Sequence, residues 1–132
     1  MKRLVEVVAA VLVLTWSLPS SAVEAWKAPA RAAKKKNPVA SGDASLAAGA
    51  KVWAAECVSC HGGKGLGDGV GVKDLEKKPE PLGPLLAAQS DGELFWKVTE
   101  GKKPMPGFAA KLSETDRWNV VNSMRALCGE KK

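Results

Sequence analysis

The chain has 132 residues, of which 45% are hydrophobic and 26% are charged. This length suits one folded domain and excludes two independent cores, and the composition excludes a wholly disordered chain. The formal net charge is +6, and the sequence contains three cysteines and a single histidine.

The first 25 residues are typical of an export signal peptide. A basic start precedes an apolar stretch from Leu4 to Leu18, and small residues follow it. Cleavage after Ala22 or Ala25 fits the pattern equally well. The apolar stretch is shorter than the roughly 20 residues of a spanning helix and contains Glu6, so removal is expected rather than membrane anchoring. We therefore predict a periplasmic protein in an oxidising compartment.

Residues 26–41 are predicted to be a linker or a disordered arm, because they are rich in Ala, Pro and Lys without apolar periodicity. They hold five basic and no acidic residues, whereas residues 42–132 hold 13 basic and 12 acidic residues. Positive charge on a tail argues against nucleic-acid binding. A solvated arm is expected, with contact to an acidic partner or weak contact to an anionic membrane surface as the alternative.

Residues 42–132 are predicted to form one all-α domain, since no stretch alternates as a strand. Asp43 or Ser45 is expected to cap a first helix that leads into Cys57. The Gly- and Pro-rich stretch 62–84 predicts a loop with one helical turn near residues 72–75. Two later helices are predicted from capping boxes and helical apolar spacing, one from Ser90 and Glu93 to Gly101 and one from Ser113 and Asp116 to Cys128.

The segment Cys57–His61 reads C-V-S-C-H, the arrangement of c-type haem attachment. Two thiols three residues apart on a helical turn reach the two vinyl groups of one porphyrin, and the adjacent histidine lies under the iron. A zinc site would need a second ligand pair, and only Cys128 remains. A thioredoxin-like pair would need a βαβ context. The sequence therefore predicts one covalently bound haem c with Cys57 and Cys60 as thioethers and His61 as an iron ligand.

Met105 is the predicted sixth ligand of the iron. Proline on both sides is expected to hold it in a rigid, extended loop. The other methionines are Met1, in the export segment, and Met124, on the packing face of the last helix. A Met and His pair raises the reduction potential relative to two nitrogen ligands, which favours a moderately high-potential electron carrier.

The order of these motifs resembles the class I monohaem cytochrome c family: Gly49 and Trp53, then Cys57–His61, then Met105-Pro106-Gly107-Phe108 and a C-terminal helix. The resemblance covers residues 42–127. It implies a small cytochrome c fold of three to four helices around one haem. In this family the first and last helices cross where a glycine meets an aromatic or apolar side chain. Gly49 and Trp53 match the first helix, and Val121 and Met124 stand where the family usually has an apolar residue and an aromatic, so Met124 departs from the family pattern.

Many members of this family orient the histidine through a proline carbonyl that accepts from its second ring nitrogen. In this sequence the candidate acceptors are the carbonyls of Val70, Pro81 and Pro84, and the choice stays open.

These features predict an electron-transfer protein and not an enzyme, acting as a soluble carrier or as the haem subunit of an exported oxidoreductase. An open-site peroxidase or gas-binding haem protein is the alternative. Redox partners with acidic docking surfaces are expected to meet a set of lysines near the site, namely Lys64, Lys97, Lys102 and Lys103. We expect a monomer, with Trp96 and Trp118 in packing roles. Cys128 is expected to be a buried small residue, with an intermolecular disulfide as the alternative.

Overall fold

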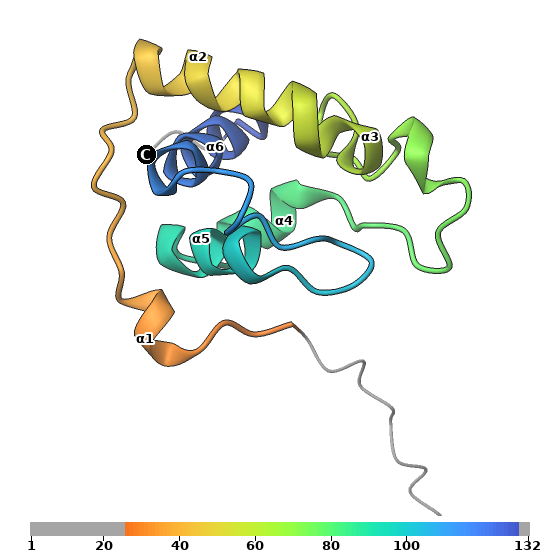
Figure 1. Cartoon of the computed structure of the whole chain (residues 1–132), viewed down its shortest axis with the longest axis horizontal. Coiled ribbons are helices and arrows are strands. Elements are labelled where there is room, and N and C mark those ends of the chain that lie inside the picture. Colours follow the sequence, from red (N-terminus) through yellow and green to blue (C-terminus); the bar gives the residue numbers. More distant parts are fainter. Residues whose placement is uncertain (1–25, 130–132) are drawn as a thin grey trace, which may run out of the picture.

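The computed structural model describes residues 26–129, so the predicted signal peptide lies outside the described residues, as do residues 130–132. Within this range every regular element is helical, which confirms the predicted all-α class (Figure 1). In chain order these are α1 (Ala30–Ala33), α2 (Asp43–Val52), the π-helix η1 (Trp53–Cys57), α3 (Val58–His61), the 3-10 turn η2 (Val70–Val72), α4 (Leu82–Ala87), α5 (Asp91–Glu100) and α6 (Glu114–Leu127).

Helices α2 and α6 cross at Gly49, which is buried. A Cβ at this position would lie 2.6 Å from the carbonyl carbon of Asn119 and 2.7 Å from the Cβ of Ser123. The glycine of the predicted crossing is therefore in place, but it meets a backbone carbonyl and a small side chain. The expected partners Val121 and Met124 are buried in the core instead, because so close an approach leaves no room for a larger residue.

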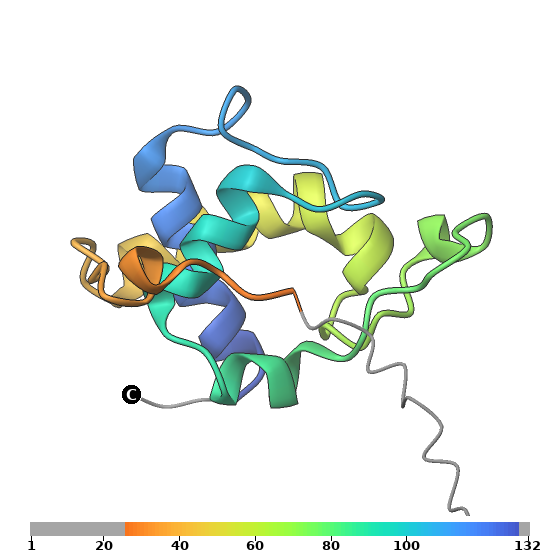
Figure 2. The same cartoon turned by 90° about the horizontal axis from the view of Figure 1, so that it is seen from below.

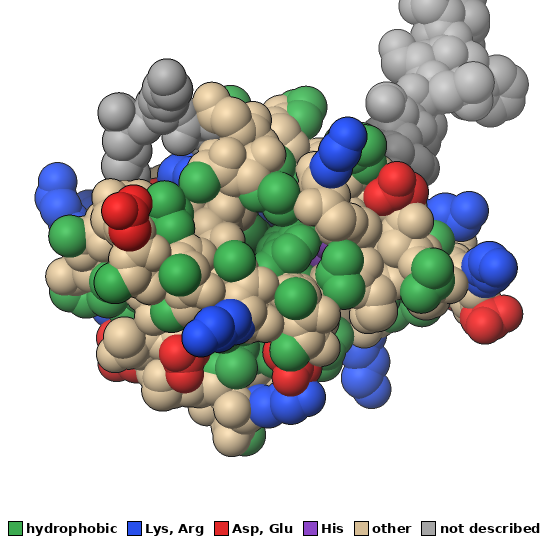
Figure 3. All heavy atoms as spheres, turned by 90° about the horizontal axis from the view of Figure 1, so that it is seen from above, with side chains coloured by type: hydrophobic (Ala, Val, Ile, Leu, Met, Phe, Trp, Pro, Cys, Tyr) green, Lys and Arg blue, Asp and Glu red, His purple; other side chains and the backbone are tan. Residues whose placement is uncertain are grey.

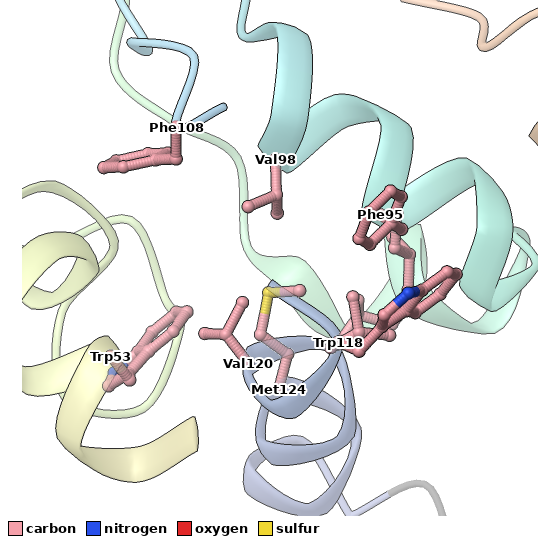
Figure 4. Packing of buried hydrophobic residues seen from close by; sticks show 10 residues of the cluster. Trp53, Phe95, Val98, Phe108, Trp118, Val120 and Met124 are labelled. Carbon is pink, nitrogen blue, oxygen red and sulfur yellow. The ribbon is translucent and has the colours of Figure 1, made fainter. Parts of the chain in front are cut away.

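The core is formed by side chains of η1, α4, α5, α6 and the loop between α5 and α6. On one side of it Phe95 and Trp118 stack, with ring centroids 3.9 Å apart (Figure 4). Trp118 is fully buried, which confirms its packing role. Trp96 is half-buried and packs on Trp26 with the ring centroids 6.3 Å apart. Aromatic side chains bury large areas, so these contacts dominate the apolar stabilisation of a small domain.

The predicted caps of the two later helices are confirmed. The Ser90 N–H donates to the Glu93 carboxylate at 2.7 Å, and the Glu93 N–H donates to the Ser90 hydroxyl at 3.3 Å. The Asp116 N–H donates to the Ser113 hydroxyl at the start of α6. Helix α2 differs from the prediction, because Gly42 precedes it and no side chain caps it.

The stretch 62–84 is largely irregular, as predicted. Its helical turn is η2 at residues 70–72, two residues earlier than expected. Helix α4 was not predicted, because Gly83 and Pro84 are typical of loops. Pro84 fits there because it lies in the first helical turn, where backbone N–H groups have no partner within the helix.

Residues 26–41, which we call the strap, lie against the domain instead of forming a disordered arm (Figure 1, Figure 2). Ala32 is buried, and Gly92 of α5 is packed against the carbonyls of Ala32 and Lys35. The Asn37 amide donates to the Asn122 side chain at 2.9 Å. These contacts use small and amide side chains, which leave no apolar period in the sequence.

Candidate functional site

Three of the four predicted site residues lie at the end of one long helical segment. Helix α2 continues through η1 into α3 without a break, so residues 43–61 form a single rod. Cys57 ends η1, and Cys60 and His61 form the last turn of α3. The chain then turns away at Gly62, whose φ of 77° belongs to the left-handed region that favours glycine.

The loop after the motif closes back onto α3 through backbone hydrogen bonds. The Gly67 N–H donates to the His61 carbonyl at 2.9 Å, and the Gly69 N–H donates to the Cys60 carbonyl at 3.2 Å. These bonds satisfy carbonyls at the end of α3 that have no partner within the helix. The backbone positions of the second cysteine and the histidine are therefore held from both sides.

Met105 lies in the loop that connects α5 to α6. The backbones of Lys102 and Met105 exchange two hydrogen bonds of 3.0 and 2.9 Å around a cis Lys103–Pro104 bond. The loop is therefore a closed turn and not the extended segment that its prolines suggested. It returns to α5 where the Phe108 N–H donates to the Val98 carbonyl at 3.0 Å.

Cys57 and Met105 are brought to the same apolar cluster, although 48 positions separate them in the sequence. Both are half-buried against core residues that include Trp53, Val98 and Phe108. The side chains of these three residues face a common space from three different elements (Figure 4). Hydrophobic side chains gather in a hollow on this side of the molecule (Figure 3). An apolar, half-open site of this kind suits a large flat apolar cofactor.

His61 is partly buried beside Trp53, with ring centroids 5.9 Å apart. Burial lowers the pKa of His61, which favours the neutral imidazole that binds metals. Its Nδ1 and the Nε1 of Trp53 are buried without a hydrogen-bond partner among residues 26–129. The bond from His61 to Val70, Pro81 or Pro84 that the sequence left open is therefore not formed. A buried nitrogen without a hydrogen-bond partner is costly. Two of them in neighbouring rings therefore fit a site that receives a further group.

The thiols of Cys57 and Cys60 are not joined in a disulfide. Burial, followed by the charges of Glu56 and Cys60, raises the pKa of Cys57 to about 12. Reactive cysteine pairs have lowered pKa values, so this environment argues against a thioredoxin-like function. No group of three or more His, Cys, Asp or Glu side chains within residues 26–129 is arranged to hold a metal ion.

The predicted set of lysines is only partly exposed. Lys64, Lys102 and Lys103 are exposed. Lys97 is half-buried, and its amine lies 5.3 Å from the ring centre of Trp26. The amine donates a hydrogen bond to the Gln89 side chain. Burial is the main reason that its pKa is lowered. Lys97 thus belongs to the packing of the strap and not to an exposed ring of charge.

The all-α fold, the C-x-x-C-H turn and the methionine loop at one apolar cluster together define a c-type cytochrome domain. Residues 44–122 match the family model described as cytochrome C oxidase, cbb3-type, subunit III, so the chain belongs to this cytochrome c family. This confirms the resemblance inferred from the motifs. Haem c is the cofactor of the family, and electron transfer by haem is the function that membership supports.

Curated relatives of the chain include cytochrome c6 proteins. The one from a Picosynechococcus species is 36% identical over 84 residues, which covers 59% of this chain and 69% of the relative. The one from Parathermosynechococcus lividus is 35% identical over 78 residues and is covered over 85% of its length.

Two solved structures resemble the fold. A chain of the reducing HAO-like protein complex of Kuenenia stuttgartiensis has a TM-score of 0.62 and 28% identity. The match covers 68% of this chain and 46% of that one, so this chain spans less than half of that neighbour. The KustC0563 c-type cytochrome has a TM-score of 0.50 and 25% identity, with 64% of this chain and 98% of that chain covered.

None of the helices within residues 26–129 has the length and apolar character needed to cross a bilayer.

Proposed function

We propose that this protein transfers single electrons through one covalently attached haem c with His and Met axial ligands. Cys57 and Cys60 would form the two thioethers, and His61 and Met105 would bind the iron. The observation that supports this best is the shared apolar cluster, because it joins the end of the C-x-x-C-H helix to the methionine loop.

The residues of the chain have distinct tasks in this proposal. Burial lowers the pKa of the partly buried His61, which favours the neutral imidazole whose nitrogen lone pair can bind the iron. The Met105 thioether is a soft ligand that raises the reduction potential and closes the sixth position to small molecules. The surrounding side chains Trp53, Val98 and Phe108 exclude water. When bound, the haem supplies an iron that cycles between two oxidation states.

We also propose that the chain is exported, that it loses residues 1–25 and that it acts in the periplasm as a monomer. This rests on the basic start, the apolar stretch and the small residues of the N-terminal segment. Its partners are redox proteins with acidic docking surfaces, and the protein serves as a free carrier or as the haem subunit of an exported oxidoreductase.

The optical spectrum of the purified holoprotein tests the iron ligands. We expect the weak near-infrared charge-transfer band of ferric iron bound to methionine, retained in Met124→Leu and lost in Met105→Ala. Met124 is a suitable control because it is buried in the core. If the band is absent and the ferrous protein binds carbon monoxide readily, the sixth site is open. A peroxidase or gas-binding function would then replace the electron carrier.

A second measurement tests the attachment. Denaturing electrophoresis followed by a haem stain, together with the intact mass, is expected to show one haem retained per chain. Cys57→Ser with Cys60→Ser should abolish the retained stain, whereas Cys128→Ser should leave it unchanged. Retention in the double variant would exclude thioether attachment at these two cysteines.

A further inference from the structure

The strap concentrates the positive charge of the molecule. It holds five basic residues and no acidic one, whereas residues 42–129 contain 11 of each sign. Among contacts within residues 26–129, Lys35 is the only strap residue that forms an ion pair, with Glu114 at 2.9 Å. Lys27, Arg31, Lys34 and Lys36 are exposed, and none of them forms an ion pair within the described part of the chain. Four strap cations therefore have no carboxylate partner in the part of the chain that the structure describes.

The strap is fixed to the domain. The Asn122 side chain, only 3% exposed, donates to the Val39 carbonyl at 3.1 Å and accepts from the Asn37 amide at 2.9 Å. Ala32 is buried against α5, and the Lys35 amine lies 4.4 Å from the ring centre of Phe95. Anchors on both sides of residues 34 and 36 hold the exposed cations at defined positions. Such a pre-organised charged surface loses little conformational entropy when it binds.

The part of the strap that follows residue 29 lies away from the candidate haem site. Helix α1 and the chain that leads from it to α2 occupy one end of the long axis (Figure 1, Figure 2). The end of α3 and the tip of the methionine loop lie toward the other end in both views, next to the 62–84 loop that forms that end. A partner bound at Arg31, Lys34 and Lys36 would therefore leave the site end uncovered.

We propose that the strap docks on an acidic protein surface, a cluster of Asp and Glu side chains, and presents the haem end outward. Defined cation positions suit a folded partner with carboxylates at matching positions. The large hydrophobic side chains exposed within residues 26–129 are Leu66, Val70, Leu85 and Leu127, and none of them lies on the strap to enter a lipid surface. Docking rests on the strap alone, and only the outward orientation rests on the proposed function.

The test compares two variants of the holoprotein that have the same net charge. One replaces the strap cations (Arg31→Gln, Lys34→Gln, Lys36→Gln), and the control replaces three exposed lysines of the 62–84 loop (Lys73→Gln, Lys77→Gln, Lys78→Gln). Affinity for immobilised poly-L-glutamate is measured by interferometry at low and physiological ionic strength. We expect a loss of about tenfold for the strap variant and less than about twofold for the control. Equal losses would mean that net charge alone drives binding, which would overturn the proposal.

The second arm of the test measures binding to vesicles of phosphatidylglycerol and phosphatidylcholine. The vesicles carry the same concentration of negative charge as the poly-L-glutamate. Binding to poly-L-glutamate at least as tight as to the vesicles supports a protein partner, and tighter binding to the vesicles overturns it in favour of a membrane surface. Unchanged haem spectra and melting temperatures verify the fold of both variants. A protein without methionine ligation that still binds through the strap would refute the proposed function and leave the docking intact.

The orientation has its own readout. The rate at which benzoquinone, a small neutral oxidant, oxidises the reduced protein is measured with and without bound poly-L-glutamate. Rates within about twofold are expected if the haem end stays open. A large decrease on binding would show that the strap and the site share one covered face.

Discussion

Replacing Gly49 by alanine is expected to destabilise the protein, even though alanine is the better helix former. The new Cβ would lie 2.6 Å from the Asn119 carbonyl carbon, whereas ordinary contacts begin at 3.4 Å. Since the neighbouring atoms are the Asn119 carbonyl and the Cβ of Ser123, neither of which moves when a side chain rotates, no rotamer change relieves the overlap. Helices α2 and α6 must therefore move apart at the point where they cross.

The size of the effect follows from two opposing contributions. Overpacking of a close contact costs about 1–3 kcal/mol, and a movement of whole helices belongs near the upper end. The gain in helix propensity from glycine to alanine returns about 1 kcal/mol. The net loss is about 1–2 kcal/mol, and at about 4–8 °C for each kcal/mol in a domain of this size the melting temperature should decrease by about 4–16 °C.

Thermal unfolding of the holoprotein, followed by circular dichroism, measures this loss. The control is Gly83→Ala in helix α4, where an added Cβ meets no atom within 4 Å. This control should change the free energy of unfolding by less than about 0.5 kcal/mol, because the gain from replacing glycine is offset by Pro84, which disfavours the helical conformation of a non-glycine residue before it. A Gly49→Ala protein that melts at or above the wild-type temperature would refute the reasoning about the crossing.

Three other predictions concern contacts that hold the strap and α6. Asn122→Ala should cost about 2–3 kcal/mol in chemical denaturation, since it removes a buried amide and leaves its partners unpaired. Arg125→Met should cost about 3 kcal/mol, and much less when Asp91 is also changed to Asn, because the largely buried pair is then removed as a whole. The hydrogen bond from Lys35 is the main cause that lowers the pKa of Glu114, so the pKa of Glu114 measured by NMR titration should rise in Lys35→Gln. This hydrogen bond stabilises the folded protein at pH values above the usual pKa of a glutamate. That stability is lost as the pH falls through the lowered pKa of Glu114.

The parts of the fold that could be predicted from sequence are those determined by short segments. The caps at Ser90 and Ser113 depend on hydrogen bonds between residues three positions apart. The C-x-x-C-H motif is likewise contained in one helical turn. Such local patterns determine their geometry before any long-range packing forms.

Other parts depend on contacts between distant residues and could not be predicted. The docking of the strap relies on an amide at position 37 meeting another at position 122, and neither residue type signals this in the sequence. Composition alone favoured a disordered arm, because small and basic residues have no apolar period. The partners of Gly49 were wrong for a related reason. The spacing identified a packing face on α6 but not which residues of that face meet the glycine.

The methionine loop leaves and rejoins helix α5 at almost the same place. It departs at Gly101, and it returns where the N–H groups of Phe108 and Ala109 donate to the carbonyls of Val98 and Thr99. The intervening residues therefore form a cassette whose entrance and exit are tied to one helical turn. A substitution between these two points therefore leaves the ends of the loop where α5 holds them, so the side chain presented at position 105 can be exchanged without moving the helices.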